Sequence, residues 1–427
     1  MDLLSGILAY SRHVLDARVV LRNSIITSLG LFIRSGLQLV YFILVARSLG
    51  PTEYGSFGAA IALVAIFSPY SMLGAGNLLI KHASRNRAEF CPYWGSALAV
   101  VSIMGSLLTM VVVLTYRLLL PSSTQLWIIV LLCLSDLLFA RYIDIAAQAL
   151  QACEMIAQMN LIQTTLFAAK LISAVALLIP MVAHTAGTWA VLYFLSSLVS
   201  GTYAVAVVNR RLGRGAFDAM PILKEVKEGF YFSVGLSAAS VYNDIDKTMM
   251  AMYSTLDATG VYVAAYRIVD AAMTPIRGLL TAVYTRFFVA GQLGTRGTVP
   301  IVKRLVPFGV SYGLVAIATI LLGAGVVPFV LGDAYTATAA TLRWLSPIIL
   351  LRAVHSIVGD SLTGAGLQGV RTGVQGVVAV ANVAMNIFLI PLYGLIGAIV
   401  SSLACDSLLL IMLSAVLVAS RFVRRAT

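Results

Sequence analysis

The amino-acid sequence predicts an all-α polytopic membrane protein. In it, twelve transmembrane helices form two parallel six-helix repeats around a central cavity, and both termini are cytoplasmic. Three observations lead to this fold class. The 427 residues are 60% hydrophobic and only 11% charged, which is unlike any soluble domain of this size. Apolar runs long enough to cross a bilayer recur along the whole chain. The Lys and Arg residues between these runs gather in alternate loops.

Twelve apolar runs are the predicted spans. They cover residues 24–46, 56–80, 93–114, 126–147, 159–181, 187–208, 230–253, 258–282, 306–331, 343–365, 372–392 and 395–420. Drawn as alternate crossings, they leave nineteen Lys and Arg on one side and three, Arg47, Arg117 and Arg343, on the other. A wrongly divided span would scramble this alternation. The positive-inside rule therefore supports the count of twelve and places both termini in the cytoplasm.

The segments outside the spans complete the division of the chain. Residues 1–21 start with Asp2 rather than a basic residue, and no small-residue cleavage site follows, so a signal peptide is not expected. Their apolar residues recur at helical spacing, which predicts an amphipathic helix on the inner leaflet. The predicted units are this interfacial helix at 1–21, a first six-helix bundle at 22–208, a basic cytoplasmic linker at 209–229, a second bundle at 230–420 and a basic cytoplasmic tail at 421–427.

The two halves of the chain resemble each other at nearly constant offsets. The matching positions are Gly55, Phe57, Ala59 and Ala60 with Gly260, Tyr262, Ala264 and Ala265 (offset 205), Ile179-Pro180 with Ile390-Pro391 (offset 211), and Gly187 with Gly397 (offset 210). Six spans in each half give both halves the same orientation, so the repeats are predicted to be parallel, related by an axis along the membrane normal. In transporters of this kind the substrate lies between the halves near the midplane.

Charged residues inside the predicted spans are candidates for functional residues, because they do not follow the internal repeat. The seven cations are Arg34, Arg141, Lys170, Lys247, Arg267, Arg277 and Arg352, and the seven acids are Asp136, Asp144, Asp244, Asp246, Asp270, Asp360 and Asp406. Arg34 lies in the first span on one face with Thr27, Gln38 and Tyr41. A central Arg costs roughly 2.5–3.5 kcal/mol unless it faces a cavity or a partner. Either the rim of a water-filled chamber or an acid on a neighbouring helix would account for it.

The eighth span is the most informative. Arg267, Asp270, Thr274 and Arg277 share one arc of the helix, and Pro275 predicts an interruption beside them. Arg267 and Asp270 could neutralise each other, but Arg277 has no acid within one turn. Five of the seven intramembrane cations are Arg, which binds phosphate bidentately and keeps its charge in a low dielectric. A cavity lined by Arg of the first, eighth and tenth spans suits an anionic phosphate or pyrophosphate head, and suits a cationic drug poorly.

Other polar residues support a transporter without metal or cofactor. In the seventh span Asp244 and Lys247 lie one turn apart, with Asp246 on another side, as in a coupling-ion site or a salt bridge that closes an outer gate. The four cysteines show no metal-ligand spacing and predict no disulfide. The net charge of +12 would suggest nucleic-acid binding in a soluble protein, but the alternate loops explain it better, and no nucleic-acid partner is expected.

Motifs in the first 90 residues carry a family resemblance. Asn23 and Arg34 at their spacing, ARSLGPTEYGSFGAAIAL at 46–63 and LGAGNLLIKHASR at 73–85 resemble the polysaccharide flippases of the multidrug/oligosaccharidyl-lipid/polysaccharide exporter superfamily. IPLYGLIGAIVSSL at 390–403 is similar to that family's penultimate loop. The resemblance implies movement of undecaprenyl-diphosphate-linked oligosaccharides across the bacterial plasma membrane. It also implies that Arg34 and Arg267 match cavity arginines of the related lipid II flippase, although that branch has two more spans.

The leading hypothesis is therefore a flippase, not an enzyme, that works by alternating access and is coupled to H⁺ or Na⁺. The residues predicted to bind the diphosphate are Arg34, Arg267 and Arg352. Arg277, Lys170 and Lys247 are predicted to bind substrate in a supporting role, by adding to the positive electrostatic potential of the cavity. The residues predicted to carry the coupling ion are Asp244, Asp246 and Asp270. The expected partners are the lipid-linked glycan, membrane lipids and the polysaccharide polymerase machinery.

Two other hypotheses stay open. A drug or solute antiporter of the same superfamily would be expected to carry an acid in the first span, where this chain has Arg34, and one of the major facilitator type would carry Gly-x-x-x-Asp-Arg-x-Gly, where this chain has KHASRNRAEF. A membrane enzyme such as a polysaccharide polymerase would need extended outer loops with carboxylates. The predicted outer loops are short and nearly free of them.

Overall fold

The computed structural model describes residues 17–216 and 219–423 of the 427. Most of the predicted interfacial helix at 1–21, part of the linker at 209–229 and most of the tail at 421–427 lie outside the described residues. Residues 17–21 are described as the start of the first long helix.

The described chain consists of helices joined by short turns and loops, some of them 3-10, and contains no strand. In the first half the helices are α2 (Ala17–Phe67), α3 (Ala75–Ala83), α4 (Phe90–Leu119), α5 (Leu126–Cys133), α6 (Ala140–Ala152), α7 (Ile156–Ala176) and α8 (Ala186–Leu212). In the second half they are α9 (Ala219–Tyr253), α10 (Leu256–Ala272), α11 (Thr274–Gly291), α12 (Thr295–Gly323), α13 (Val327–Leu331), α14 (Thr336–Leu345), α15 (Pro347–Gly364), α16 (Gln368–Tyr393) and α17 (Leu395–Val423). A π-helical segment, Leu134–Phe139, joins α5 to α6.

Eight helical segments of the described chain are long and apolar enough to cross a membrane, or nine if α14 and α15, bent by 46°, form one span. One of the eight, Ile26–Ala83, covers two of the predicted spans. The helices α9, α10 and α11, where intramembrane charges gather, are not among them. The count of twelve spans and the orientation of the termini therefore stay predictions.

A single glycine divides α2 into two helices. Gly50 has φ 72° and ψ 170°, a conformation that glycine adopts without steric cost, and Pro51 directly follows. Proline is favoured at the first position of a helix because its missing N–H is not needed there. The first and second predicted spans are thus joined by a one-residue break rather than a loop.

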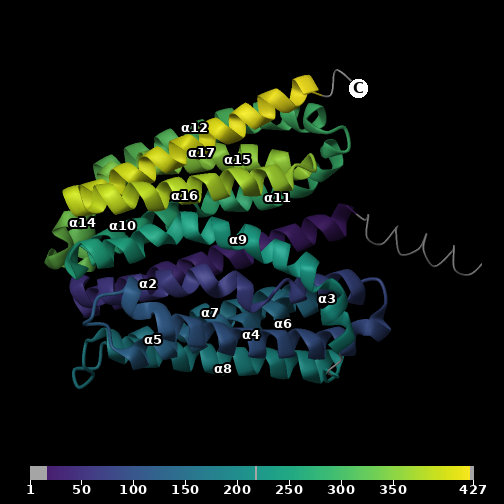
Figure 1. Ribbon diagram of the computed structural model, residues 1–427, viewed down its shortest axis with the longest axis horizontal. Coiled ribbons are helices and arrows are strands. Elements are labelled where there is room, and N and C mark those ends of the chain that lie inside the picture. The colour runs from purple at the N-terminus through teal and green to yellow at the C-terminus, as the bar shows by residue number, and fades with distance from the viewer. Residues whose placement is uncertain (1–16, 217–218, 424–427) are drawn as a thin grey trace, which may run out of the picture.

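The helices form two halves, one above the other in Figure 1, with α2 to α8 below and α10 to α17 above. The helix α9 packs on both α16 and α2, and α10 packs along α2. The upper helices come closest to the lower ones at the left of the view and diverge from them toward the right (Figure 1). A hydrophobic core with members from both halves, such as Phe42, Trp189 and Leu345, joins them.

Two glycines that the internal repeat pairs lie in contact at the junction of the halves. A Cβ built on Gly55 would lie 2.7 Å from the Gly260 nitrogen, and one on Gly260 would overlap the Pro51 carbonyl oxygen. Neither position admits a side chain, so α2 and α10 cross with their backbones in contact. Small residues permit the same close approach between membrane helices in general.

The same end of the molecule is held by hydrogen bonds between the halves. Arg47 Nη1 donates to the carbonyl oxygens of Phe329 at 3.3 Å and Val330 at 3.2 Å. The Tyr335 hydroxyl donates to the Ala46 carbonyl oxygen at 2.9 Å. We call this set, with the Gly55–Gly260 contact, the closed end.

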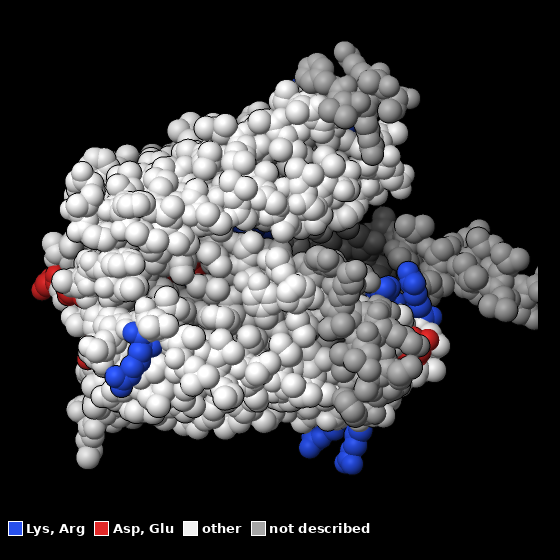
Figure 2. Space-filling view, viewed as in Figure 1, with Lys and Arg blue, Asp and Glu red and all other residues white. Residues whose placement is uncertain are grey.

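The outer surface is apolar between the two ends of the molecule. Leu118, Ile172, Leu322 and Phe388 are large hydrophobic residues that lie exposed. On the face shown in Figure 2, the described charged residues lie mainly toward the ends, with a few charged atoms in the seam between the halves. Such a belt of exposed apolar side chains is what a lipid-facing surface requires.

Candidate functional site

A cavity of about 280 Å³ lies between the two halves, where α2, α9, α10, α11 and α15 meet. Its uncharged lining includes Ser35, Gln38 and Asn243. Its charged lining consists of the cations Lys247, Arg267, Arg277 and Arg352 and the carboxylates Asp244 and Asp270. The cavity, which we call the cationic cavity, therefore carries a surplus of two positive charges.

Asp270, in the last turn of α10, lies between two arginines. Arg277 Nη2 donates to Asp270 Oδ1 at 3.2 Å, and Arg352 Nη1 lies 3.9 Å from the same oxygen. The predicted interruption at Pro275 is confirmed, since α10 ends at Ala272 and α11 begins at Thr274. The sequence indicated no acid within one turn of Arg277, and none lies there. Its partner is Asp270, two turns away, which the long Arg side chain reaches across this break.

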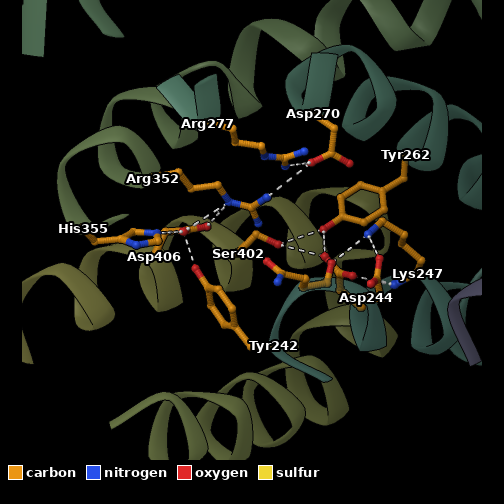
Figure 3. Close-up of polar contacts among 12 residues, drawn as sticks. Tyr242, Asp244, Lys247, Tyr262, Asp270, Arg277, Arg352, His355, Ser402 and Asp406 are labelled. Atoms are coloured by element: carbon orange, nitrogen blue, oxygen red, sulfur yellow. Dashed lines mark hydrogen bonds and ion pairs between the residues drawn. The ribbon is translucent and has the colours of Figure 1, made fainter. Parts of the chain in front are cut away.

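Arg352 also contacts a second carboxylate, that of Asp406. Its Nε lies 3.3 Å from Asp406 Oδ1. Asp406 is 1% exposed and also contacts His355 Nε2 at 3.0 Å, while the Tyr242 hydroxyl donates to it. Figure 3 shows this line of groups from His355 through Asp406 and Arg352 to Asp270. Asp406 therefore fixes the direction in which Arg352 enters the cavity.

Lys247 and Asp244 form the pair that their spacing predicts. Lys247 Nζ donates to Asp244 Oδ1 at 2.6 Å and to the Asn243 carbonyl oxygen at 2.7 Å (Figure 3). Its ammonium also lies 4.8 Å from the ring centroid of Tyr266. The Arg352 guanidinium carbon lies 5.4 Å from the same centroid. Both cations thus contact one aromatic ring.

Asp246 is buried behind the cavity rather than lining it. It is 2% exposed and accepts hydrogen bonds from the Tyr262 hydroxyl at 2.6 Å, the Ser402 hydroxyl at 3.3 Å and the Lys247 backbone N–H at 2.8 Å. Among the described residues no Lys, Arg or His side-chain nitrogen lies within 4.0 Å of its carboxylate. Its direct contacts are therefore hydroxyl and amide groups, and not an ion pair.

Arg267 is the one cation of the cavity lining without a carboxylate among the described residues within 4.0 Å. It lies near Tyr41 and Tyr54, and Asp270 is occupied by Arg277 instead. Mutual neutralisation of Arg267 and Asp270, one of the two interpretations of this span, is therefore not what the structure contains.

Two predicted substrate residues lie away from the cationic cavity. Arg34 Nη1 donates to the side-chain oxygen of Gln163 on α7. Lys170 is 4% exposed inside the first half, with its ammonium 3.6 Å from the ring centroid of Tyr193. The Tyr193 hydroxyl donates to Asp136 Oδ1 at 3.0 Å. The structure thus brings Arg267 and Arg352 together, as predicted, but does not bring Arg34 to them.

No binding or coupling role was predicted for Asp406, His355 or Tyr242. The available signal was weak: His355 lies one turn after Arg352, and Asp406 is a single acid in an apolar span. A lone acid does not reveal which cation it meets 54 positions away in the chain.

Comparison with known proteins identifies the family. The model of the family described as polysaccharide biosynthesis protein matches residues 20–288. This chain belongs to the polysaccharide biosynthesis protein family. The match covers more than half of the chain and includes the motifs at 46–63 and 73–85. No curated protein matches the sequence.

The fold of this polysaccharide biosynthesis protein is shared with solved transporters. An inward-facing multidrug resistance MATE family transporter of the MOP superfamily superposes with a TM-score of 0.73 at 13% identity, covering 91% of this chain and 98% of that one. The lipid II flippase MurJ, in an inward closed conformation, gives 0.72 at 12%, covering 92% and 86%. A MOP superfamily transporter from Pyrococcus furiosus, described as having a binding pocket of reverse polarity, gives 0.67 at 12%, covering 93% and 96%. The family match confirms the resemblance to a polysaccharide family inferred from the sequence, and these structures show that the fold is that of the superfamily's transporters.

Proposed function

We propose that this protein is a flippase that moves an undecaprenyl-diphosphate-linked oligosaccharide, an O-antigen or exopolysaccharide repeat unit, across the bacterial inner membrane. Twelve spans with both termini in the cytoplasm would carry it, by alternating access coupled to H⁺ or Na⁺. The observation that supports the proposal most is the cationic cavity, with its surplus of two positive charges and its unpaired Arg267. Family membership and a fold shared with the lipid II flippase MurJ support it as well.

The charges of the cavity match a diphosphate. Arg267 offers a guanidinium that no described carboxylate occupies, and such a group binds phosphate through two parallel hydrogen bonds. Arg277 is 54% exposed at its side chain, so its remaining nitrogens are available. Arg352, held by Asp406, supplies a third guanidinium, and Lys247 adds to the field. An incoming diphosphate would displace Asp270 from Arg277.

Arg34 and Lys170 take supporting roles in this proposal. Arg34 lies one turn before Gln38 on α2, and Gln38 lines the cationic cavity, so both are on the same face of the helix. Arg34 would meet the diphosphate on its way in. Lys170 would raise the positive potential from within the first half.

The coupling ion would be carried by Asp246, with Asp244 and Asp270 responding to it. Asp246 is surrounded by the oxygens of Tyr262 and Ser402, groups that suit either a proton or Na⁺. It adjoins Lys247 in sequence, and the Lys247 backbone N–H is one of its partners. Binding of a proton or Na⁺ at Asp246 would thereby affect the Lys247–Asp244 pair at the cavity wall. The proposed partners in the membrane are lipids and the polysaccharide polymerase machinery.

A thermal-shift titration of the detergent-purified protein with undecaprenyl diphosphate tests this function. We expect saturable stabilisation of the wild type and a loss of that stabilisation in Arg267→Ala. The control is Arg343→Ala, which removes an exposed positive charge outside the cavity and should behave as the wild type. If Arg267→Ala and the wild type respond alike, the arginine is a structural counter-ion and the antiporter hypothesis moves ahead.

A further inference from the structure

A second cavity, of about 380 Å³, adjoins the cationic cavity along α9. Asn243 and Asp244 line both, so the two spaces meet at one turn of that helix. The rest of its wall comes from the 3-10 turn Ser68–Ser71, from α3 and from α6. Its volume is in the range of small-ligand pockets, roughly 300–1,000 Å³.

The charged groups of this second cavity are already paired. Arg141 Nη1 lies 2.8 Å from Asp144 Oδ2, and its Nε donates to the Asp136 carbonyl oxygen at 3.1 Å. Asp244 is held by Lys247. The second cavity therefore has no surplus charge in its lining, in contrast to the cationic cavity, and is a poor site for a phosphate.

Uncharged polar side chains line it instead, and several have no partner among the described residues. The Gln148 side-chain oxygen is one, and no hydrogen bond within the described chain uses the Asn77 or Ser240 side chain. Gly76 makes room for Gln148, because a Cβ there would overlap its amide. Amides and hydroxyls both donate and accept hydrogen bonds, as sugar hydroxyls require.

Apolar groups complete the wall. Pro69 and Met72 lie beside these amides in the lining. A site with a few placed polar groups on an apolar wall is the usual form of a small-molecule pocket, in which the polar groups set orientation and specificity. A sugar ring offers both matching surfaces, since its hydroxyls project from a body of C–H groups.

We propose that this second cavity is a saccharide subsite that binds the sugars attached to the diphosphate. The inference rests on the proposed function: the diphosphate lies in the cationic cavity, and the first sugars extend past Asn243 and Asp244 toward Asn77 and Gln148. The cationic cavity then supplies affinity for any lipid diphosphate, and the second cavity selects the glycan.

The test is a binding titration of the full-length purified protein with two probes. One is undecaprenyl diphosphate, and the other is the undecaprenyl-diphosphate-linked oligosaccharide extracted from cells that make this protein. The variants are Asn77→Ala, at an exposed position, and Gln148→Ala. The matched control is Gln151→Ala, an exposed glutamine one turn along α6 that does not line the cavity.

We expect the wild type to bind the glycosylated lipid more tightly than the bare one. Each variant should lose roughly three- to tenfold in affinity for the glycosylated lipid, the usual effect of one hydrogen bond, and keep its affinity for undecaprenyl diphosphate. Equal losses for both probes, or no loss for either, would overturn the saccharide subsite while leaving the flippase intact. Failure of the wild type to bind either probe would overturn the proposed function and the subsite together.

Discussion

In the proposed flippase, Asp270 would control how firmly the cationic cavity holds an anion. Its Oδ1 accepts from Arg277 and lies 3.9 Å from Arg352, so it occupies the place that a phosphate oxygen would take. A transporter has to release its substrate as well as bind it. A carboxylate that competes for the same arginines would provide this release, because it would pair with them again when the substrate leaves.

Asp270→Asn removes that competition at nearly constant volume. We expect affinity for undecaprenyl diphosphate to rise about three- to tenfold, since the amide no longer neutralises Arg277, and flipping to slow because release becomes harder. Titration of the purified variant and transport in liposomes measure the two effects. An affinity that falls would show that Asp270 orients the arginines for the substrate rather than competing with it.

Asp406 is the residue on which the position of Arg352 depends. Asp406→Ala would leave a buried guanidinium without its carboxylate, and breaking a buried pair in this way costs about 3–5 kcal/mol. We expect a clear fall in the thermal unfolding temperature of the detergent-purified variant. Asp333→Ala, at an exposed acid, is the control and should unfold as the wild type does. Equal unfolding temperatures for both would mean that water or lipid reaches Arg352.

The sequence predicted which charged residues would lie in one cavity better than it predicted their partners. Arg267 and Arg352, with Lys247 and Arg277 in support, were expected in one cavity and lie there. Spacing along one helix gives local pairs such as Asp244 and Lys247. It does not give Arg352 with Asp406, because that contact depends on how α15 and α17 pack, nor the separate position of Arg34, which depends on α7.

At the scale of elements, breaks in the helices place the site. The interruption after Ala272 lies between Asp270 and Arg277, and Arg277 reaches back across it to Asp270. Gly50 divides α2, and Gly55, which follows this break, lies against α10. The repeat predicted that Gly55 and Gly260 correspond, but not that they touch. Their contact depends on how α2 and α10 pack, which spacing along the chain does not indicate.

Gly260→Ala tests this crossing. The added methyl group would overlap the Pro51 carbonyl oxygen, which is backbone and cannot swing aside. Overpacking of this kind costs about 1–3 kcal/mol, so we expect a lower unfolding temperature. Gly376→Ala on α16 is the matched control, because a Cβ there meets nothing within 4 Å. If the two variants unfold at the same temperature, the halves are free to separate at this crossing without strain.

At the scale of the whole molecule, the two halves are joined at the closed end and diverge away from it (Figure 1). The charged groups lie between these halves, where a rocking motion would expose them to either side in turn. The sequence could predict two halves from its repeat, but the contacts that hold them join residues hundreds of positions apart. Pattern and spacing carry no signal for such contacts.

Arg47→Ala should shift the balance between the states of the cycle. Its guanidinium ties the first half to the carbonyl oxygens of Phe329 and Val330, and nothing else in the alanine variant would replace these two bonds. We expect the population of molecules that are open at this end to rise roughly three- to tenfold.

Spin labels at Ser123 and Asp333, exposed positions in the first and second halves, would report this rise as growth of the longer-distance population. The control is Arg117→Ala, which removes an exposed arginine whose hydrogen-bond partner, Tyr116, lies on its own helix. An unchanged distance distribution in Arg47→Ala would place the restraint in the glycine crossing, where Gly260→Ala can be measured with the same labels.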